Sequence, residues 1–326
     1  GSASGVDFGG EVELWFDGFL KLRFAMRPQN GEARDVSSLR LKYALKDEAA
    51  KYILAPSFKP WRNEAFTGRF GTGRNDLSLL WLTGPEAGLA WWCESRANWS
   101  TSGDDVRVDR HGDAVEVEID IIAKPERLRE AASYTMALQA TPNKRPDRLY
   151  RVRFNARSAK APANEGDWSS CGWASHSGVS RPDNIRHWTS LVPTHPSGFS
   201  DYLKERKASG RDIFVYSMPL HISPLDPPWD MFSGEWLKSP GIRWDFVDET
   251  PRRRSHVVPC CGVTGAADWH AANAKKLLAT QPLLAGIYYD ISSIGDCVNV
   301  RHGHGGVDSF GRAYATSTAL GMREYF

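Results

Sequence analysis

"RVDRHGDAVEVEIDII", residues 107–122, alternates apolar and polar side chains on both sides of a central Gly-Asp pair. In its second half Val115, Val117 and Ile119 lie two residues apart, and a period of two places them on one face of a β-strand. Residues 110–113 supply the turn, because glycine and aspartate accept the backbone conformations of a tight hairpin. The stretch therefore predicts a half-buried antiparallel hairpin, and it indicates the architecture of the first half of the chain.

Similar alternating segments occur throughout the first half, separated by Gly, Asn, Asp or Pro: "EVELWFDGFLKLRFAM", "AGLAWWCES" and "SYTMALQATP". Several such strands have enough apolar faces to pack as two sheets, so we expect an antiparallel β-sandwich over residues 6–157. Within it, Trp91 and Trp92 are interpreted as core residues. Residues 37–53 leave two alternatives open, a helix or a strand that finishes as a helix.

A small, polar stretch, "SAKAPANEGDW", indicates a linker over residues 158–167. Beyond it, over residues 168–326, apolar strands alternate with the helical segments "GFSDYLKERKASG" and "AADWHAANAKKLLATQP". The expected strands are "RDIFVYSMPL", "RSHVVPCCGV" and "LLAGIYYD". Strands that alternate with helices predict βαβ units and a parallel sheet, so the second domain is expected to be of the (β/α) type.

Composition narrows the class of partner. The 326 residues carry 41 basic and 39 acidic side chains, and no long run of one sign indicates a nucleic-acid partner. The longest apolar runs, such as "LSLLWL", are far shorter than the roughly 18 residues of a membrane-spanning helix. Five cysteines, with Cys260 beside Cys261, do not fit a disulfide framework, so we interpret them as buried free thiols.

Polar residues follow the expected parallel strands of the second domain. In parallel α/β folds the reactive groups lie at the carboxyl ends of strands, which nominates His176, Tyr216, Cys260 and Asp290 for one face of the domain. Asp290 begins the loop of "GIYYDISSIGDCVNVRHGHGG", residues 286–306.

The loop after Asp290 has two interpretations. Cys297, His302 and His304, with an aspartate nearby at 296 or 308, are ligands that zinc accepts. Against this, the spacing matches no standard zinc signature, and histidines two apart on an extended loop would point in opposite directions. We therefore expect no metal and no cofactor, and instead contacts of the histidines with sugar hydroxyls. The loop's glycines would permit a tight backbone path: Gly303, Gly305 and Gly306.

Four segments carry a family resemblance: "MALQATPNKRPDR", "GEWLKSPGIRW", the loop at residues 286–306, and "GMREYF". From about residue 39 onward the chain resembles glycoside hydrolase family 123 related proteins of bacterial glycan-degrading systems. The resemblance implies a β-sandwich followed by a (β/α)8 barrel and an N-acetylhexosaminidase-like activity. In that family an adjacent Asp-Glu pair ends a barrel strand, the Asp orienting the substrate's acetamido group and the Glu protonating the leaving oxygen. Here Asp290 is followed by Ile291, so the expected glutamate is absent.

We accordingly expect a secreted or periplasmic glycoside hydrolase that acts on an oligosaccharide or polysaccharide, as an exo-acting N-acetylgalactosaminidase-like enzyme. The alternative is a non-catalytic carbohydrate-binding protein on a hydrolase scaffold. Asp290 and Asp296 are the catalytic candidates, and further candidates for the missing proton donor are Asp308, Glu235 and Glu324. The candidate substrate-binding residues, which include tryptophans suited to stack on sugar rings, are His176, Trp173, Tyr216, Tyr289, Asn299, His302, His304 and Trp236.

The number of strand-helix units is the final observation. Only about four units fit between residue 168 and the last residues, whereas a closed (β/α)8 barrel needs eight. We therefore expect an incomplete barrel in this chain, completed by a longer polypeptide, a second chain or self-association. The final stretch, "GMREYF", is expected to open a helix.

Overall fold

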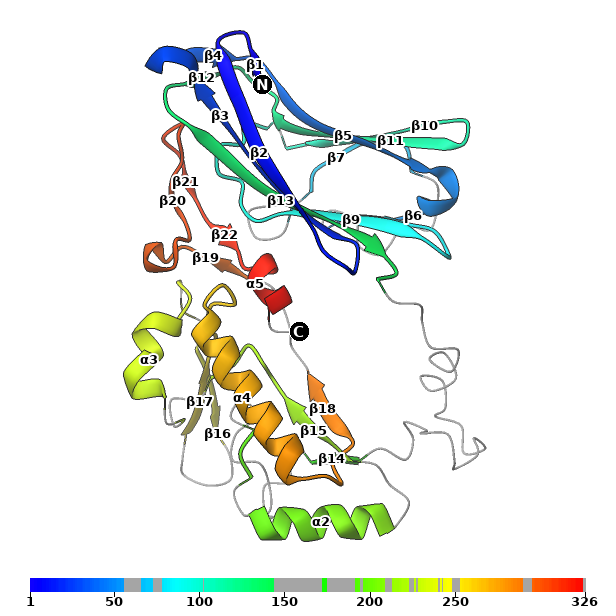
Figure 1. Cartoon of the computed structure of the whole chain (residues 1–326), viewed down its shortest axis with the longest axis vertical. Coiled ribbons are helices and arrows are strands. Elements are labelled where there is room, and N and C mark those ends of the chain that lie inside the picture. The colour runs from blue at the N-terminus through cyan, green and yellow to red at the C-terminus, as the bar shows by residue number, and fades with distance from the viewer. Residues whose placement is uncertain are drawn as a thin grey trace. The chain divides into compact units, whose positions relative to one another are not determined.

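The computed structural model divides the chain into two compact units (Figure 1). The first unit combines Gly1–Arg145 with Ile294–Ala319, and the second combines Pro146–Ser293 with Leu320–Phe326. This division differs from the sequence-based boundary, which placed residues 294–319 with the second domain. The structure describes residues 1–55, 66–72, 78–101, 103–143, 172–174, 191–193, 196–208, 213–222, 226, 228–239, 241, 243–247, 253–289 and 295–324.

The larger sheet of the first unit has seven strands, and every neighbouring pair in it is antiparallel. In spatial order they are β1 (Ser2–Ala3), β2 (Val6–Leu14), β3 (Phe19–Pro28), β13 (Ala132–Thr141), β9 (Gly88–Cys93), β8 (Ser78–Thr83) and β6 (Tyr52–Leu54). Strand β13 is central and pairs with β3 on one side and β9 on the other, so segments more than a hundred residues apart share one sheet.

The second sheet has four strands, in the order β5 (Leu39–Lys46), β11 (Ala114–Ile122), β10 (Val106–His111) and β7 (Gly68–Phe70). Strands β10 and β11 form the predicted hairpin, and Gly112 in its turn has a positive φ of 61°. Residues 37–53 form β5, the 3-10 turn η2 (Asp47–Ala49) and the start of β6, so no α-helix occurs there. Two short strands, β4 (Arg34–Val36) and β12 (Glu126–Leu128), pair separately, and η1 covers Gln29–Gly31.

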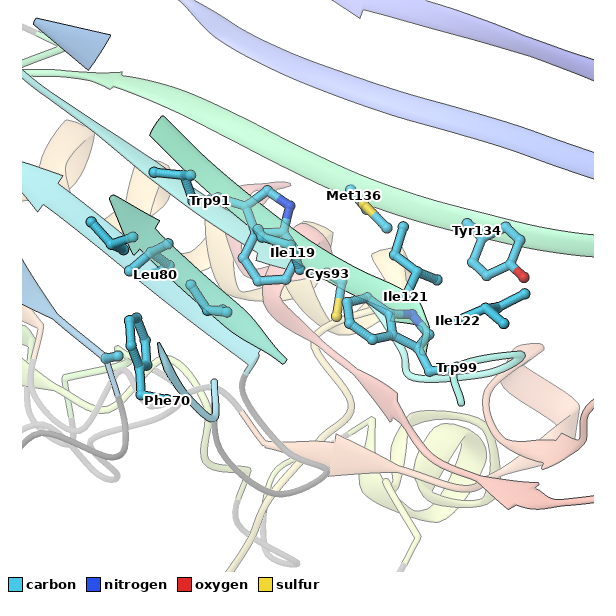
Figure 2. Close-up of a cluster of buried hydrophobic side chains, with 14 of the residues drawn as sticks. Phe70, Leu80, Trp91, Cys93, Trp99, Ile119, Ile121, Ile122, Tyr134 and Met136 are labelled. Atoms are coloured by element: carbon cyan, nitrogen blue, oxygen red, sulfur yellow. The ribbon is translucent and has the colours of Figure 1, made fainter. Parts of the chain in front are cut away.

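The core of the first unit is made by side chains from both sheets, as Figure 2 shows. Leu80 and Trp91 come from the seven-stranded sheet, Ile119 comes from the four-stranded sheet, and all three are fully buried. Each such side chain contributes about 1.5–3 kcal/mol through removal from water. The predicted β-sandwich and the core position of Trp91 are therefore confirmed.

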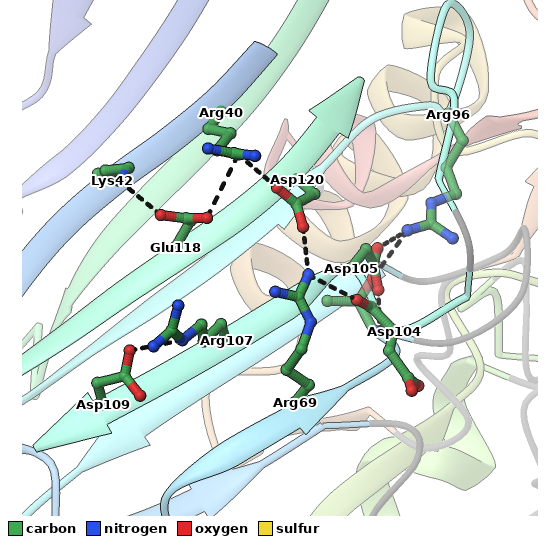
Figure 3. A network of polar contacts seen from close by, with 11 residues as sticks. Arg40, Lys42, Arg69, Arg96, Asp104, Asp105, Arg107, Asp109, Glu118 and Asp120 are labelled. Carbon is green, nitrogen blue, oxygen red and sulfur yellow. Dashed lines mark hydrogen bonds and ion pairs between the residues drawn. The ribbon is translucent and has the colours of Figure 1, made fainter. Parts of the chain in front are cut away.

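Ion pairs cover one face of the four-stranded sheet (Figure 3). Arg40 lies 2.8 Å from Asp120, and Lys42 lies 2.5 Å from Glu118. The basic partners are about half exposed, so each of these pairs contributes little to stability. Asp105 differs because its carboxylate is fully buried. It accepts hydrogen bonds from Thr72 N and Thr72 Oγ1, both at 2.8 Å, and pairs with Arg96.

The second unit contains a three-stranded parallel sheet of β14 (Gly172–Ala174), β15 (Ile213–Ser217) and β18 (Gly286–Tyr289). The helices α2 (Pro196–Ala208) and α4 (Thr264–Thr280) fall between these strands in the sequence. Phe199 and Leu277, one from each helix, form a buried cluster with Val215 of β15. The predicted alternation of parallel strands and helices is confirmed for these elements.

One predicted parallel strand belongs to a different sheet. Within "RSHVVPCCGV", β17 (Arg253–Val257) pairs antiparallel with β16 (Arg243–Val247), and α3 (Trp229–Trp236) precedes this pair. The five residues between β16 and β17 are too few for the crossover that a parallel connection requires. Cys260 therefore follows a hairpin, and the prediction that four parallel strand ends converge there is wrong. Among the described residues the parallel strands number three, and they form no closed barrel.

The segment at residues 295–318 folds as small ladders of the first unit. Strand β19 (Asp296–Cys297) pairs with β22 (Thr316–Ser317), and β20 (Gly306–Val307) pairs with β21 (Ala313–Tyr314). The 3-10 turn η4 (Val300–His302) lies between them, and α5 (Ala319–Glu324) confirms the predicted final helix. A bridge between Ser95 and Thr316 joins this segment to the end of β9. In the part of the chain that the structure describes, no helix is both long and apolar enough to cross a membrane.

Candidate functional site

The histidine loop, residues 295–307, is shaped by one asparagine and three glycines. Asn299 caps η4, since its Oδ1 accepts a hydrogen bond of 3.1 Å from Arg301 N. Gly303 follows in the left-handed conformation, with φ 71°, and turns the chain back. As a result the rings of His302 and His304 meet edge to face, with their centroids 5.8 Å apart. The expectation that the two histidines point in opposite directions is wrong, because the loop is not extended at Gly303.

Gly305 fills the tightest position in this loop. Its φ is 70°, and a Cβ at this position would lie 2.7 Å from Val298 Cα. Its N–H donates to Thr316 Oγ1 at 3.1 Å, which fixes the loop against β22. The prediction that the loop's glycines permit a tight backbone path is confirmed, and Gly306 also has a positive φ, of 133°.

Cys297 lies at the base of the histidine loop, and its side chain is fully buried. Its Sγ is 3.5 Å from His302 Nδ1 and accepts the N–H of Asn299 at 3.4 Å. The other ring nitrogen of His302, Nε2, lies 3.1 Å from Asn299 Nδ2. Cys297, His302 and His304 each offer one ligand atom, and these atoms lie within 4.8 Å of one another. This set of donors could hold a transition-metal ion.

A pocket of about 450 Å³ lies beside the two histidines, within the first unit. One wall comes from the histidine loop and the residues that follow it, and the other comes from the ends of β9 and β13 and nearby loops. The lining is mostly polar and consists of Glu94, Ser95, Ala97, Asn98, Glu130, Ala131, Ser133, Thr135, His302, Gly303, His304, Val307, Asp308, Ser309, Tyr314 and Thr316.

Three carboxylates line this pocket, and they differ in their surroundings. Asp308 holds the loop together, since it accepts N–H groups from Asn98, Phe310 and Arg312 at 2.9 Å each. Burial raises the pKa of Glu94, and the nearby positive charges of Lys21 and Arg23 only partly oppose this effect. Glu130 is exposed. Glu94 is therefore the carboxyl group of the pocket whose surroundings favour the protonated form.

His304 titrates below the ordinary range. Burial lowers its pKa, and the neighbouring His302 lowers it further. The imidazole of His304 is consequently neutral at pH 7. A neutral ring can accept a hydrogen bond from a hydroxyl group or bind a cation through a ring nitrogen.

Three residues predicted from the loop sequence take part in this arrangement, and one does not. His302 and His304 line the pocket, and Asn299 contacts the ring of His302. Asp296 lies in β19 opposite Ser317 and is not among the lining residues.

The remaining predicted residues fall in the second unit. Asp290 and His176 lie outside the described residues, while Trp173 and Tyr216 lie on the parallel strands β14 and β15. Tyr289 is partly buried on β18, and its hydroxyl lies 3.2 Å from His270 Nε2 on α4. This contact places Tyr289 on the face of the sheet that α4 covers.

Trp236 does not have the exposed face that a sugar platform needs. Its side chain is only 4% exposed, and it stacks on Phe232 with ring centroids 5.2 Å apart. The ring of Trp269 also lies beside Trp236, with the two ring centroids 6.1 Å apart. The prediction that Trp236 stacks on a sugar is therefore wrong, because neighbouring rings already cover it. The four cysteines within the described part of the chain, which include Cys260, are buried and form no disulfide, as predicted.

Sequence reasoning missed Glu94, Glu130 and Tyr314. Glu94 directly follows a strand that was interpreted through its tryptophans, and some two hundred residues separate it from His302. The available signal was weak: a single acidic residue at the end of a strand in a segment expected to pack as a sandwich.

No protein-family model matches the sequence, and no curated protein matches it. Solved structures that the chain is similar to include the α-galactosidase of Lactobacillus brevis, at 11% identity and a TM-score of 0.35, over 88% of this chain and 45% of that one. A GH36 α-galactosidase of Geobacillus stearothermophilus matches at 12% identity and a TM-score of 0.37, over 88% and 47%. The Thermus thermophilus α-galactosidase in complex with stachyose matches at 13% identity and a TM-score of 0.28, over 88% and 65%.

This chain thus spans about half the length of the first of these solved structures. At such identities and TM-scores the likeness carries no argument about activity.

Proposed function

We propose that this protein acts on a glycan and that the polar pocket of the first unit binds one of its sugars. The observation that carries the proposal is the pocket itself. Its volume of about 450 Å³ falls in the range of small-ligand sites. A sugar presents hydroxyl groups that both donate and accept hydrogen bonds, and the lining offers carboxylates, hydroxyls, an amide and two imidazoles.

The proposal extends to glycoside hydrolysis, because the pocket contains a candidate proton donor. Cleavage requires a carboxylic acid that stays protonated near neutral pH and delivers its proton to the leaving oxygen. Glu94 fits this role because burial raises its pKa. Glu130 is the candidate for the second carboxylate, since Asp308 is already engaged by three backbone N–H groups.

A finer version of the proposal rests on the family resemblance alone. It makes the protein an exo-acting N-acetylgalactosaminidase-like enzyme that uses Asp290 and Asp296, and it makes the protein secreted or periplasmic. Immunoblots of culture medium and periplasmic fractions from the native host would test the compartment. The two assignments make different carboxylates essential, so single substitutions separate them.

A second candidate function is carbohydrate binding without catalysis. The observation that favours it is the architecture of the second unit, whose described residues form three parallel strands and no closed barrel. The resemblance implies that such a barrel carries the reaction. In that case the pocket of the first unit would bind sugar, and no hydrolysis would follow.

Turnover of chromogenic glycosides tests these proposals. The panel contains N-acetylgalactosaminide, N-acetylglucosaminide, galactoside and glucoside substrates, and the variants are Glu94→Gln, Asp290→Asn and the control Glu86→Gln, which lies exposed in the β8–β9 turn. If Glu94 is the proton donor, Glu94→Gln lowers kcat by about 100-fold or more, while Glu86→Gln matches the wild type.

A loss confined to Asp290→Asn would instead favour the finer assignment. Absence of turnover on every substrate, together with calorimetric binding of a free sugar that Glu94→Gln weakens, would favour the carbohydrate-binding protein. Absence of both turnover and binding would reject the proposal.

A further inference from the structure

We propose that Cys297, His302 and His304 bind a transition-metal ion, with Zn²⁺ as the expected occupant. This inference concerns a site next to the proposed sugar pocket and does not depend on what the pocket binds. One thiolate and two imidazoles are the donors that zinc prefers, whereas Mg²⁺ and Ca²⁺ prefer oxygen ligands. The three donors converge although they are spread over eight residues of an irregular loop.

The distance between the sulfur and the nearest imidazole fits a shared ion. Zn–S bonds of about 2.3 Å and Zn–N bonds of about 2.0–2.1 Å at a tetrahedral angle separate the two donor atoms by about 3.6 Å. Cys297 Sγ and His302 Nδ1 are 3.5 Å apart. The ligand atom of His304 lies within 4.8 Å of both, so a small rotation of its ring completes a three-coordinate face.

The surroundings of the sulfur suit a metal ligand. Cys297 is fully buried, and the backbone N–H of Asn299 points at its Sγ. A metal-bound cysteine carries negative charge on its sulfur, and a donated N–H stabilises that charge. Full burial also argues against Cys297 as a nucleophile paired with His302, because a substrate could not reach the sulfur. A bound metal uses the same buried sulfur without requiring access for a large molecule.

Asn299 completes the arrangement by holding the ring of His302. A metal-bound histidine usually donates its second ring N–H to an oxygen atom, which fixes the orientation of the ring. The Asn299 amide lies 3.1 Å from Nε2. A half rotation would present its oxygen to the Nε2–H of the metal-bound tautomer and would release the exposed Arg301 N–H to water. Nδ1 then remains directed at Cys297.

An ion can reach the site through the pocket, since His302 and His304 both line it. Spectroscopy can identify the fourth ligand of a tetrahedral ion. The glycines on either side of His304 set the backbone before any metal binds, because Gly303 and Gly305 have φ values of 71° and 70°. One loop thus supplies the ligand donors and a supporting amide, and the pocket beside it supplies an entry route.

The experiment uses the full chain, stripped with a chelator and titrated with Zn²⁺ and Co²⁺. Elemental analysis should give about one bound Zn²⁺ per chain. Bound Co²⁺ should give the visible bands of a tetrahedral ion and a near-ultraviolet thiolate charge-transfer band. X-ray absorption of the zinc form should show at least one sulfur and two imidazole ligands at zinc.

Three variants assign the ligands. His304→Gln and Cys297→Ser should weaken Co²⁺ binding by about 100-fold or more, and Cys297→Ser should also remove the thiolate band. Asn299→Ala should weaken it by about 10–100-fold, as expected for a residue that orients a ligand. The control is His111→Gln at the exposed end of β10, which should bind as the wild type does. Circular dichroism identifies variants that fail to fold.

The X-ray absorption measurement on the wild type keeps the proposal falsifiable even if the cysteine variant does not fold. Folded wild type that binds no stoichiometric zinc, or a zinc ion without sulfur in its coordination shell, would overturn the proposal. Unchanged cobalt binding in folded His304→Gln would do so as well.

Discussion

Cys297 Sγ lies 3.5 Å from His302 Nδ1, and the amide of Asn299 closes the same arrangement from the other side of the imidazole ring. This contact forms because η4 and the left-handed Gly303 fold five residues of loop into a closed turn. It links the proposed metal site to the proposed sugar pocket. The ring of His302 faces the buried sulfur through one nitrogen, and the same residue lines the polar pocket.

Gly305→Ala should disrupt the histidine loop. Its added Cβ would lie 2.7 Å from Val298 Cα, where backbone must shift, and the positive φ adds about 1–2 kcal/mol. Gly311→Ala is the matched control, because Gly311 has a φ of 80° and open space around its Cα. Urea unfolding should show a larger loss of stability for Gly305→Ala, together with weakened metal binding. Equal losses of stability in the two variants would mean that the close approach to Val298 does not add to the cost of the substitution.

Asp105→Ala should destabilise the sandwich by about 3–5 kcal/mol, since it leaves Arg96 and the N–H of Thr72 without their buried acceptor. Asp109→Ala is the control. Asp109 pairs with Arg107 at 2.7 Å on a half-exposed surface, and its loss should cost less than about 1 kcal/mol. Denaturant midpoints measured at pH 7 compare the two. Similar losses of stability in the two variants would contradict the prediction that the buried Asp105 contributes more than the exposed Asp109.

His221 should make the second unit sensitive to acid. Burial lowers its pKa from 6.5 to about 4, so the folded state keeps the ring neutral while the unfolded state takes up a proton. As the pH falls from about 6.5 toward 4, the unfolded state gains protons and stability is lost, by an amount on the order of 3 kcal/mol.

The difference in unfolding free energy between wild type and His221→Gln isolates this effect, because other groups titrate alike in both proteins. It should change between pH 7 and pH 4.5 in the direction that favours the variant at low pH. A difference that stays constant over this range would show that His221 is protonated equally in both states.

Glu94 should set the alkaline side of the pH profile if the protein hydrolyses glycosides. Lys21 and Arg23 hold the pKa of Glu94 below the value that burial alone would give. Lys21→Met should therefore raise this pKa, and the alkaline limb of kcat/KM should move to higher pH. Lys46→Met, at an exposed site beside Glu48, serves as the control. If the alkaline limb of the kcat/KM profile does not move in Lys21→Met, a group other than Glu94 produces it.

The sandwich was predictable because its signal is local. The spacing of Val115, Val117 and Ile119 alone predicts a strand, and the turn at Gly112 completes the hairpin within the same stretch. The antiparallel partner of β17 was not foreseen, because residues 243–247 were not expected to form a strand. The count of strand-helix units did indicate that a complete eight-stranded barrel does not fit, and the described residues form none.

The candidate site was predictable only in part, for a related reason. His302, His304 and Asn299 were singled out because polar residues cluster in one loop. The sequence did not show that Gly303 turns the two histidines toward each other, since glycine permits many conformations. Nor could it place Glu94 in the same pocket, because the bridge between Ser95 and Thr316 joins segments that are far apart in the sequence.

A crystal structure of the full chain soaked with the monosaccharide that the turnover and binding assays favour is the most direct test of the central claim. The account predicts electron density for a sugar in the pocket of the first unit, with its hydroxyl groups within hydrogen-bond distance of Glu94 and His304. Density for the sugar only outside this pocket, at a concentration that saturates binding in solution, would contradict it.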